Sequence, residues 1–218
     1  MGLIDYLSRP NVPVLSGEGI VLRLPRRSDF PAWRALREDS RGFLTPWEPV
    51  WTSDELTHAA FRRRVARYDQ EAREGNGYSF FLFDQAGETL LGGISVGHVR
   101  RGVAQSATLG YWMGERFAGK GHMRRAVEAV KLFAFEVEGL HRIEAACLPN
   151  NQRSIRLLER CGFSREGHLR GYLKIAGKWE DHCLYALLAE EWSRSGALEM
   201  APTRDSPSRH PVDRVSVS

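Results

Sequence analysis

Hydrophobic and polar positions change period along the first part of the chain, which predicts a strand followed by two helices. Residues 19–24 (GIVLRL) alternate as in a strand, and Ser28 or Asp29 with Pro31 opens a helix through about Arg37.

The following stretch, residues 41–51 (RGFLTPWEPVW), holds two prolines and two tryptophans and predicts a loop. Residues 52–55 (TSDE) then carry a capping-box pattern, in which a hydroxyl and a carboxylate three residues apart bind the free NH groups of a helix start. We therefore expect a second helix from this point to about Arg73.

The middle of the chain has the pattern of three strands at residues 78–84, 88–99 and 105–113, with a turn at 84–87. Short connections favour an antiparallel meander. Helical spacing returns after Gly121. One apolar stripe is expected there, formed by Met123, Ala126, Val127, Val130, Ala134 and Val137.

The last third predicts a short strand at residues 141–148, a helix at 151–161 closed by Gly162, and final strands within 163–188. This order predicts an α+β fold, a mainly antiparallel mixed sheet flanked by helices. We divide the chain into an N-terminal extension (1–18), one domain (19–192) and a tail (193–218). The tail is rich in Ser, Pro and Arg and is predicted to be disordered.

Composition narrows the class of protein. The 218 residues are 42% hydrophobic, enough for a sizeable core, which argues against whole-chain disorder and against a coiled coil. No stretch approaches the roughly 20 apolar residues of a membrane span, and residues 1–9 have no apolar signal core. We expect a cytoplasmic protein with Cys147, Cys161 and Cys183 reduced. The net charge of +4 (31 minus 27) suits a nucleic acid or a phosphate-bearing cofactor equally well.

The segment with the clearest chemistry is residues 116–121 (RFAGKG), between a predicted strand and a strongly periodic helix. Its glycines allow close backbone approach, and the helix start offers free NH groups to a phosphate. It is not a Walker A loop, because His122 follows the second glycine, and a dinucleotide fingerprint would require a glycine at Arg124. Taken alone, it is equally well a tight turn.

The order of motifs from GYWM at 110–113 through RFAGKG to NQRS at 151–154 and GF at 162–163 resembles the GNAT acyltransferase superfamily. Several segments resemble its RimJ/RimL branch, whose members acetylate the N-terminal residue of ribosomal proteins. These segments are FLTPWEP (43–49), LHRIEAACLPNNQRS (140–154), GFSREG (162–167) and, nearest the RimJ type, YLKIAGKWEDH (172–182). The resemblance implies the GNAT (acyl-CoA N-acyltransferase) fold.

The resemblance also implies acetyl-CoA as co-substrate, no metal, and a set of cofactor-binding residues. These are Tyr111, Trp112, Met113, Arg116, Ala118, Gly119, Lys120, Gly121, His122, Met123 and Asn151. Arg124 and Arg125 would add positive potential. The NH of Met113, or of a neighbour freed by a bulge there, would hold the oxyanion.

For catalysis the resemblance points to Ser154 as the acid that protonates the departing thiolate; the alternative is a polar residue in the first turn of a helix. The base does not carry over, because Leu173 stands where the RimL type has a glutamate. Glu48 and Glu115 are the candidates, acting through water, although Glu48 equally well braces its loop and Glu115 equally well is a solvated carboxylate. His141 and His182 are weaker candidates, and a structural pairing is the preferred account of His182.

The resemblance predicts acetylation of an N-terminal Ala or Ser of a protein, a small-subunit ribosomal protein in the RimJ type. The alternatives are a small amine or another protein as acceptor, and a ribosome-associated assembly factor in which acetylation is secondary. A basic face formed by Arg62, Arg63, Arg64 and Arg67 would contact ribosomal RNA or protein, or is simply a solvated surface.

Overall fold

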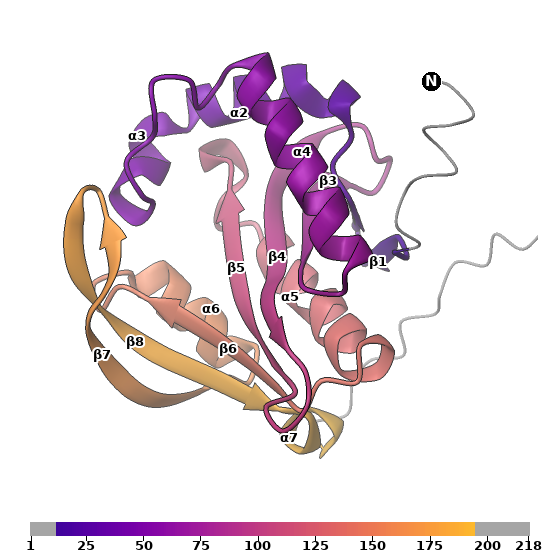
Figure 1. The fold of residues 1–218 in the computed structure, drawn as a ribbon, viewed down its shortest axis with the longest axis vertical. Coiled ribbons are helices and arrows are strands. Elements are labelled where there is room, and N and C mark those ends of the chain that lie inside the picture. Colours follow the sequence, from indigo (N-terminus) through magenta and orange to yellow (C-terminus); the bar gives the residue numbers. More distant parts are fainter. Residues whose placement is uncertain (1–11, 195–218) are drawn as a thin grey trace, which may run out of the picture.

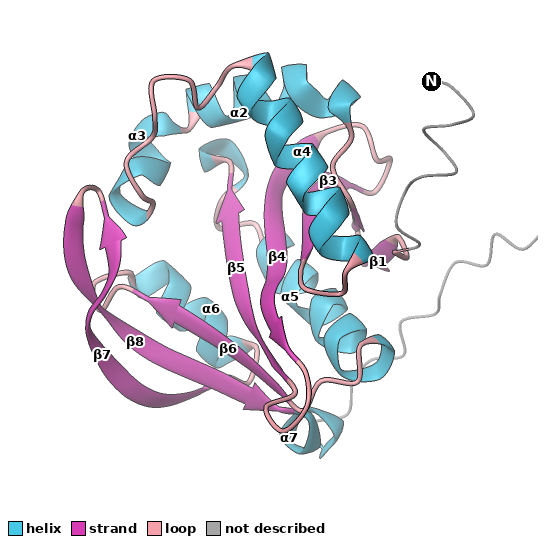
Figure 2. Ribbon diagram, viewed as in Figure 1, coloured by secondary structure: helices cyan, strands magenta, loops and turns pink. Residues whose placement is uncertain are grey.

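The computed structural model describes residues 12–194, which form one eight-stranded sheet flanked by helices (Figure 1; Figure 2). The strands are β1 (Leu15–Gly17), β2 (Ile20–Arg23), β3 (Tyr78–Asp84), β4 (Leu90–Arg100), β5 (Ser106–Met113), β6 (Arg142–Cys147), β7 (Ser164–Ile175) and β8 (Lys178–Leu188). The helices are α2 (Phe30–Asp39), α3 (Arg41–Leu44), α4 (His58–Arg73), α5 (His122–Leu132), α6 (Gln152–Arg160) and α7 (Ala189–Arg194). Single turns are η1 (Arg27–Asp29), η2 (Thr45–Trp47), η3 (Glu115–Phe117) and the π-helical η4 (Phe133–Val137).

The sheet confirms the predicted α+β class and the meander. Its strand order is β1-β2-β3-β4-β5-β6-β8-β7, and every neighbouring pair is antiparallel except β5 and β6. The sheet starts upstream of the expected boundary at Gly19, because β1 pairs with β2. The expected tail at 193–218 lies outside the described residues apart from Ser193 and Arg194, which end α7.

The two faces of the sheet are covered by different helices, and β3 shows why its sequence (YSFFLFD) is almost continuously apolar. Phe80 and Leu82 face the larger core beneath α5 and α6, whereas Phe81 and Phe83 face a second core beneath α2 and α4. A strand buried on both faces needs apolar residues at odd and even positions alike.

The stretch before α4 differs from its prediction. The expected loop at residues 41–51 contains the short helix α3 and the turn η2. The capping box expected at residues 52–55 is wrong: α4 starts at His58, and the hydroxyl of Thr57 caps it by accepting a hydrogen bond from the NH of Ala60 at 3.2 Å. At the predicted capping box, the hydroxyl of Thr52 instead donates a hydrogen bond to the Asp54 carboxylate. This local hydrogen bond takes the place of the expected helix cap at Thr52.

The apolar stripe of α5 is confirmed at Met123, Ala126, Val127, Val130 and Ala134, all of which are buried. Val137 is wrong, because its side chain is 57% exposed. The helix widens into the π-helical turn η4 after Leu132, and the wider turn rotates the later positions away from the 3.6-residue stripe.

Strands β5 and β6 separate after a short parallel contact, as Figure 1 shows. Their register covers only Ser106 to Thr108 of β5 against Arg142 to Glu144 of β6. Beyond that point β5 continues to Met113, and no strand in the described part of the chain pairs with it on this side. The parting of the two strands leaves a backbone edge available in the middle of the sheet.

On its other side, β5 approaches β4 so closely that a glycine is required at position 92. A Cβ atom on Gly92 would lie 2.4 Å from the carbonyl oxygen of Trp112 and 3.1 Å from the Cα of Met113. Neither backbone atom can rotate away. We therefore expect Gly92→Ala to lower the free energy of unfolding by about 1–3 kcal/mol, as overpacking does elsewhere.

Urea unfolding of purified Gly92→Ala measures this effect. Gly42→Ala is the matched control, because a Cβ at Gly42 meets nothing within 4 Å. It should be neutral or slightly stabilising. Equal midpoints for the two variants would contradict the close approach of β4 and β5.

None of the helices within residues 12–194 is long and apolar enough to cross a membrane. Cys147, Cys161 and Cys183 are free thiols and buried.

Candidate active site

A cavity of about 680 Å³ lies where β5 and β6 part, and this volume is within the range of small-molecule sites. Five parts of the chain form its walls: the α3–η2 segment, the end of β5, the η3 turn, the start of α5 and one face of α6. The lining residues are Phe43, Leu44, Trp47, Glu48, Tyr111, Trp112, Met113, Glu115, Phe117, Ala118, Gly119, Gly121, His122, Met123, Arg124, Asn151, Arg153, Ser154, Arg156, Leu157 and Arg160.

The open edge of β5 presents backbone NH groups to this cleft. The NH of Gly114 donates to the carbonyl of Leu91 on the β4 side at 2.9 Å. Because NH directions alternate along a strand, those of Met113 and Tyr111 point to the opposite, open side. Of the two alternatives given by the sequence, a bulge near Met113 is wrong, since the β4–β5 register is regular there and shifts between Gly97 and Arg100. Separation of the strands, rather than a bulge, exposes these groups.

The glycine-rich turn enters α5 through left-handed backbone. Gly119 has φ +78° and Gly121, the N-cap of α5, has φ +81°, values that favour glycine. No side chain caps this end of the helix, so its NH groups face the cleft together with the positive end of the helix dipole. The Nδ1 atom of His122 is buried there and has no hydrogen-bond partner among residues 12–194. Burial, followed by the charges of Arg125 and Lys120, lowers the pKa of His122.

The positive side chains of the cleft differ from those expected. Arg116 and Lys120 do not line it, and their cations lie 4.8 and 5.8 Å from the centre of the Phe117 ring. Arg124 does line it. Sequence reasoning missed three more arginines, which α6 brings to the cleft: Arg153, Arg156 and Arg160. Their spacing of three and four residues on one helix face was the signal that could have found them.

Ser154 lies on the cleft wall, in the first turn of α6, and is 8% exposed. Its Oγ atom is 2.6 Å from the phenol oxygen of Tyr111, and either atom can donate. The side chain of Asn151 caps the helix by accepting a hydrogen bond from the NH of Ser154 at 3.1 Å. The two residues predicted as acid and orienting group are thus joined directly.

Burial keeps the groups around Ser154 protonated. It raises the pKa of the Tyr111 phenol strongly, and the hydrogen bond from Ser154 offsets only part of the effect. It also raises the pKa of the Cys147 thiol. The Tyr111 phenol and the Cys147 thiol therefore remain protonated at physiological pH. Tyr111 keeps a proton that it can donate in a hydrogen bond, and Cys147 is a weak nucleophile.

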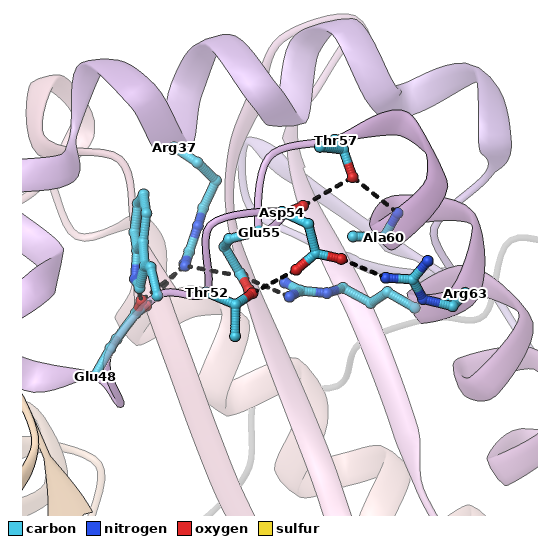
Figure 3. A network of polar contacts seen from close by, with 10 residues as sticks. Arg37, Glu48, Thr52, Asp54, Glu55, Thr57, Ala60 and Arg63 are labelled. Atoms are coloured by element: carbon cyan, nitrogen blue, oxygen red, sulfur yellow. Dashed lines mark hydrogen bonds and ion pairs between the residues drawn. The ribbon is translucent and has the colours of Figure 1, made fainter.

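Glu48 also lines the cleft, but its carboxylate is held on both oxygens. Two guanidinium nitrogens of Arg37 donate to it at 2.7 Å each, and the indole NH of Trp51 donates at 2.8 Å (Figure 3). The Arg37 side chain is only 6% exposed. This is the arrangement expected if Glu48 braces its loop.

The polar network continues to the start of α4. Three arginines of the predicted basic face form ion pairs within the chain. Arg63 binds Asp54 at 2.6 Å and Arg64 binds Glu55 at 2.5 Å (Figure 3). Arg67 pairs with Glu71 at 3.5 Å. Arg63 and Arg64 therefore join α4 to the residues that precede it, whereas the Arg67 pair lies within α4.

The other candidate bases occupy different places. Glu115 is exposed at the rim of the cleft, where its own NH donates to the hydroxyl of Ser40 at 2.9 Å. His182 is buried outside the cleft lining, and its ring contacts Tyr172. His141 is also outside the lining and lies 3.6 Å from Glu190. Within residues 12–194 no group of three or more His, Cys, Asp or Glu side chains is placed to hold a metal ion.

Comparison with known proteins gives a consistent picture. Residues 20–164 match the acetyltransferase (GNAT) domain family. The [ribosomal protein uS5]-alanine N-acetyltransferase of Escherichia coli is 35% identical over 189 residues, which cover 85% of this chain and 96% of that protein.

Two solved structures are similar over nearly their full lengths. The ribosomal-protein-S5-alanine acetyltransferase of Vibrio fischeri superposes with a TM-score of 0.77 at 29% identity, covering 83% of this chain and 99% of that one. RimJ of Mycobacterium smegmatis, in complex with CoA-disulfide, gives a TM-score of 0.75 at 30% identity, covering 89% and 99%.

Proposed function

The chain belongs to the GNAT acetyltransferase family, and from this premise we propose that it transfers an acetyl group from acetyl-CoA to the N-terminal α-amino group of a protein. It is an acyltransferase of the RimJ/RimL type. The observation that carries the finer proposal is the 35% identity to an alanine N-acetyltransferase across almost the whole of both proteins. The acceptor we propose is an N-terminal Ala or Ser of a small-subunit ribosomal protein.

The cleft has groups suited to the phosphates of acetyl-CoA and to its acyl arm. The turn at Gly119 and Gly121, with the uncapped start of α5, supplies NH groups for the pyrophosphate. The buried Nδ1 atom of His122 lies at the same turn and has no hydrogen-bond partner among the described residues, so a ligand bound there would supply one. Arg124 and the arginines of α6 provide positive potential for the remaining phosphate.

The acyl arm would lie against the open edge of β5. A polar extended chain adds to such an edge through backbone hydrogen bonds, as an extra strand does. The NH of Met113, which points into the opening, would then stabilise the negative charge that develops on the thioester oxygen during attack.

The attacking amine needs little help. A free α-amino group has a pKa of about 7.7–8.0, so a substantial fraction is neutral at physiological pH. We assign Glu48 to the brace around Arg37, and Glu115, at the rim, to accepting the released proton through water. The rate should rise with pH across the titration of the acceptor amine.

Ser154 would protonate the departing thiolate. If Tyr111 donates to the Ser154 oxygen, the serine proton is free to point into the cleft. The phenol, held neutral by burial, keeps the serine in that orientation. As the new amide forms, the C–S bond breaks, and the thiolate takes the serine proton while solvent restores it.

The test is intact-mass analysis of peptides incubated with acetyl-CoA and the full chain. Peptides with N-terminal Ala or Ser should gain one acetyl group, and the same peptides with a blocked N-terminus but a free internal lysine should not. A polyamine and an aminoglycoside serve as comparators. Turnover confined to these small amines would overturn the proposal.

The structure supports acetyl transfer better than it supports a primary role in ribosome binding. Arg63, Arg64 and Arg67 are engaged in ion pairs within the chain. Ribosome association through this face, if it occurs, would compete with those pairs.

A further inference from the structure

Two side chains from different walls of the cleft, Phe43 and Arg153, contact each other. Phe43 belongs to α3 and Arg153 belongs to α6, and both line the cleft. The guanidinium carbon of Arg153 lies 5.0 Å from the centre of the Phe43 ring, within the range of a cation–π contact. The mechanism above uses Arg153 only for its charge and does not use Phe43.

Packing of the hydrophobic cores does not explain the position of Phe43. Phenylalanine is among the residues most often buried in a core. In the described part of the chain, however, Phe43 belongs to neither of the two cores and packs against neither. Its ring is only partly buried and lines the cleft instead. The ring is therefore placed where a bound ligand would meet it.

Arg153 can contact this ring because no acidic group competes for its charge. Its guanidinium takes part in no hydrogen bond or ion pair with residues 12–194. Of the two acids that line the cleft, Glu48 is bound by Arg37 and Glu115 lies at the rim. The face of an aromatic ring is then a suitable partner for the guanidinium plane.

The contact joins two walls of the cleft that have no other polar link within the described residues. No hydrogen bond or ion pair there runs between α3 and α6. Helix α3 is fixed at its start, where the hydroxyl of its N-cap Ser40 accepts from the NH of Glu115 at 2.9 Å. Arg153, in contrast, is exposed. Its side chain can therefore leave the ring without disturbing either wall.

We propose that Arg153 and Phe43 form a latch over the cleft, in which Arg153 positions the Phe43 ring across the acyl arm of acetyl-CoA. The contact opens to admit the donor and to release CoA. When it is closed, it holds the arm against the open edge of β5 and keeps bulk water away from the thioester. The inference rests on the proposed function and adds to it a pair of residues that controls passage of the donor.

Stopped-flow tryptophan fluorescence measures the latch directly, because Trp47 and Trp112 line the cleft and report CoA binding. Phe43→Leu removes the aromatic face without changing any charge. The association and dissociation rate constants of CoA should both rise about threefold, the factor that corresponds to a cation–π contact at an exposed site. The dissociation constant, which is the ratio of these two rate constants, should change little.

Three further variants connect this effect to the contact. Phe43→Tyr keeps an aromatic face and should keep both wild-type rate constants. In an Arg153→Gln background, Phe43→Leu should have no further effect, because the contact is already lost. Arg156→Gln is the matched control, since it removes a cleft charge from the same helix that contacts no ring among the described residues. It should slow association and speed dissociation, so that the affinity for CoA falls.

The outcomes separate this inference from the proposed function. If Phe43→Leu leaves the association rate constant unchanged or lowers it, the ring is only part of the wall and the latch is wrong. The latch is also wrong if Phe43→Leu has the same effect with and without Arg153. Both results leave acetyl transfer intact, because these rates are measured with CoA alone. If the wild-type protein does not bind CoA, the proposed function fails and the latch fails with it.

Discussion

Ser154→Ala is expected to lower kcat for peptide acetylation at least about 100-fold, the usual lower limit for loss of a general acid. Without the serine proton, the thiolate must leave unprotonated or take a proton from a poorly placed water. Binding of CoA should be retained, because the cap at Asn151 uses the backbone NH of residue 154 and not its side chain.

The substitution leaves the buried phenol of Tyr111 without its partner, which costs about 1–3 kcal/mol. A double variant, Tyr111→Phe with Ser154→Ala, removes both hydroxyls. It should recover stability but not activity, so the two effects can be separated. Gln152→Ala, in the same turn but exposed and outside the cleft, is the activity control.

The measurements are steady-state kinetics on an N-terminal Ala peptide, CoA affinity by calorimetry and thermal unfolding. A variant that keeps wild-type kcat and changes only KM would assign Ser154 to the alternative, a polar residue of the first helical turn. In that case the proton for the thiolate would come from solvent.

Local patterns predicted those parts of the fold that depend on local interactions. The three strands of the meander and the stripe of α5 were found because alternation and helical spacing report directly on which face is buried. The glycine turn was found for a similar reason. A backbone with φ near +80° selects glycine at Gly119 and Gly121 whatever the rest of the chain does.

The parts that failed depend on contacts across the chain. Residues 41–51 read as a loop because prolines and tryptophans are poor helix formers, yet η2 accommodates Pro46 at its first turn and Trp51 packs against Arg37. Val137 was predicted to be buried because its position continues the helical spacing of the stripe, but nothing in the sequence pattern predicted the π-helical turn. Tertiary packing overrides weak local preferences in such places.

The same distinction holds within the site. The contact between Tyr111 and Ser154 joins residues 43 apart in sequence, and nothing local to either predicts it. Likewise, the sequence left Glu48 open as a base or as a brace of its loop, whereas its binding by Arg37 follows from how α2 packs. The types and order of residues along the sequence predicted the cleft, but the hydrogen-bond partners within it follow only from the fold.

Arg37→Met is the substitution expected to destabilise the protein most, by about 3–5 kcal/mol, because it leaves a partly buried carboxylate without its counterion. The guanidinium donates two hydrogen bonds to Glu48, and it lies 4.4 Å from the Trp51 ring and 5.2 Å from the Trp112 ring. It therefore fastens α2 to the loop at the cleft and to β5. Its loss should also lower kcat/KM, since that loop forms one wall of the site.

Urea unfolding measures the change, with Arg34→Ala as the matched control on the same helix. Arg34 pairs with Glu38 at 3.7 Å, but both side chains are more than half exposed, at 54% and 58%. Its removal should cost at most about 1 kcal/mol. The double variant Arg37→Met with Glu48→Leu removes both charges and should regain much of the lost stability, whereas Glu48→Leu alone should not. If Arg37→Met unfolds at the same urea concentration as Arg34→Ala, the buried pair does not brace the loop, and Glu48 becomes available again as the base.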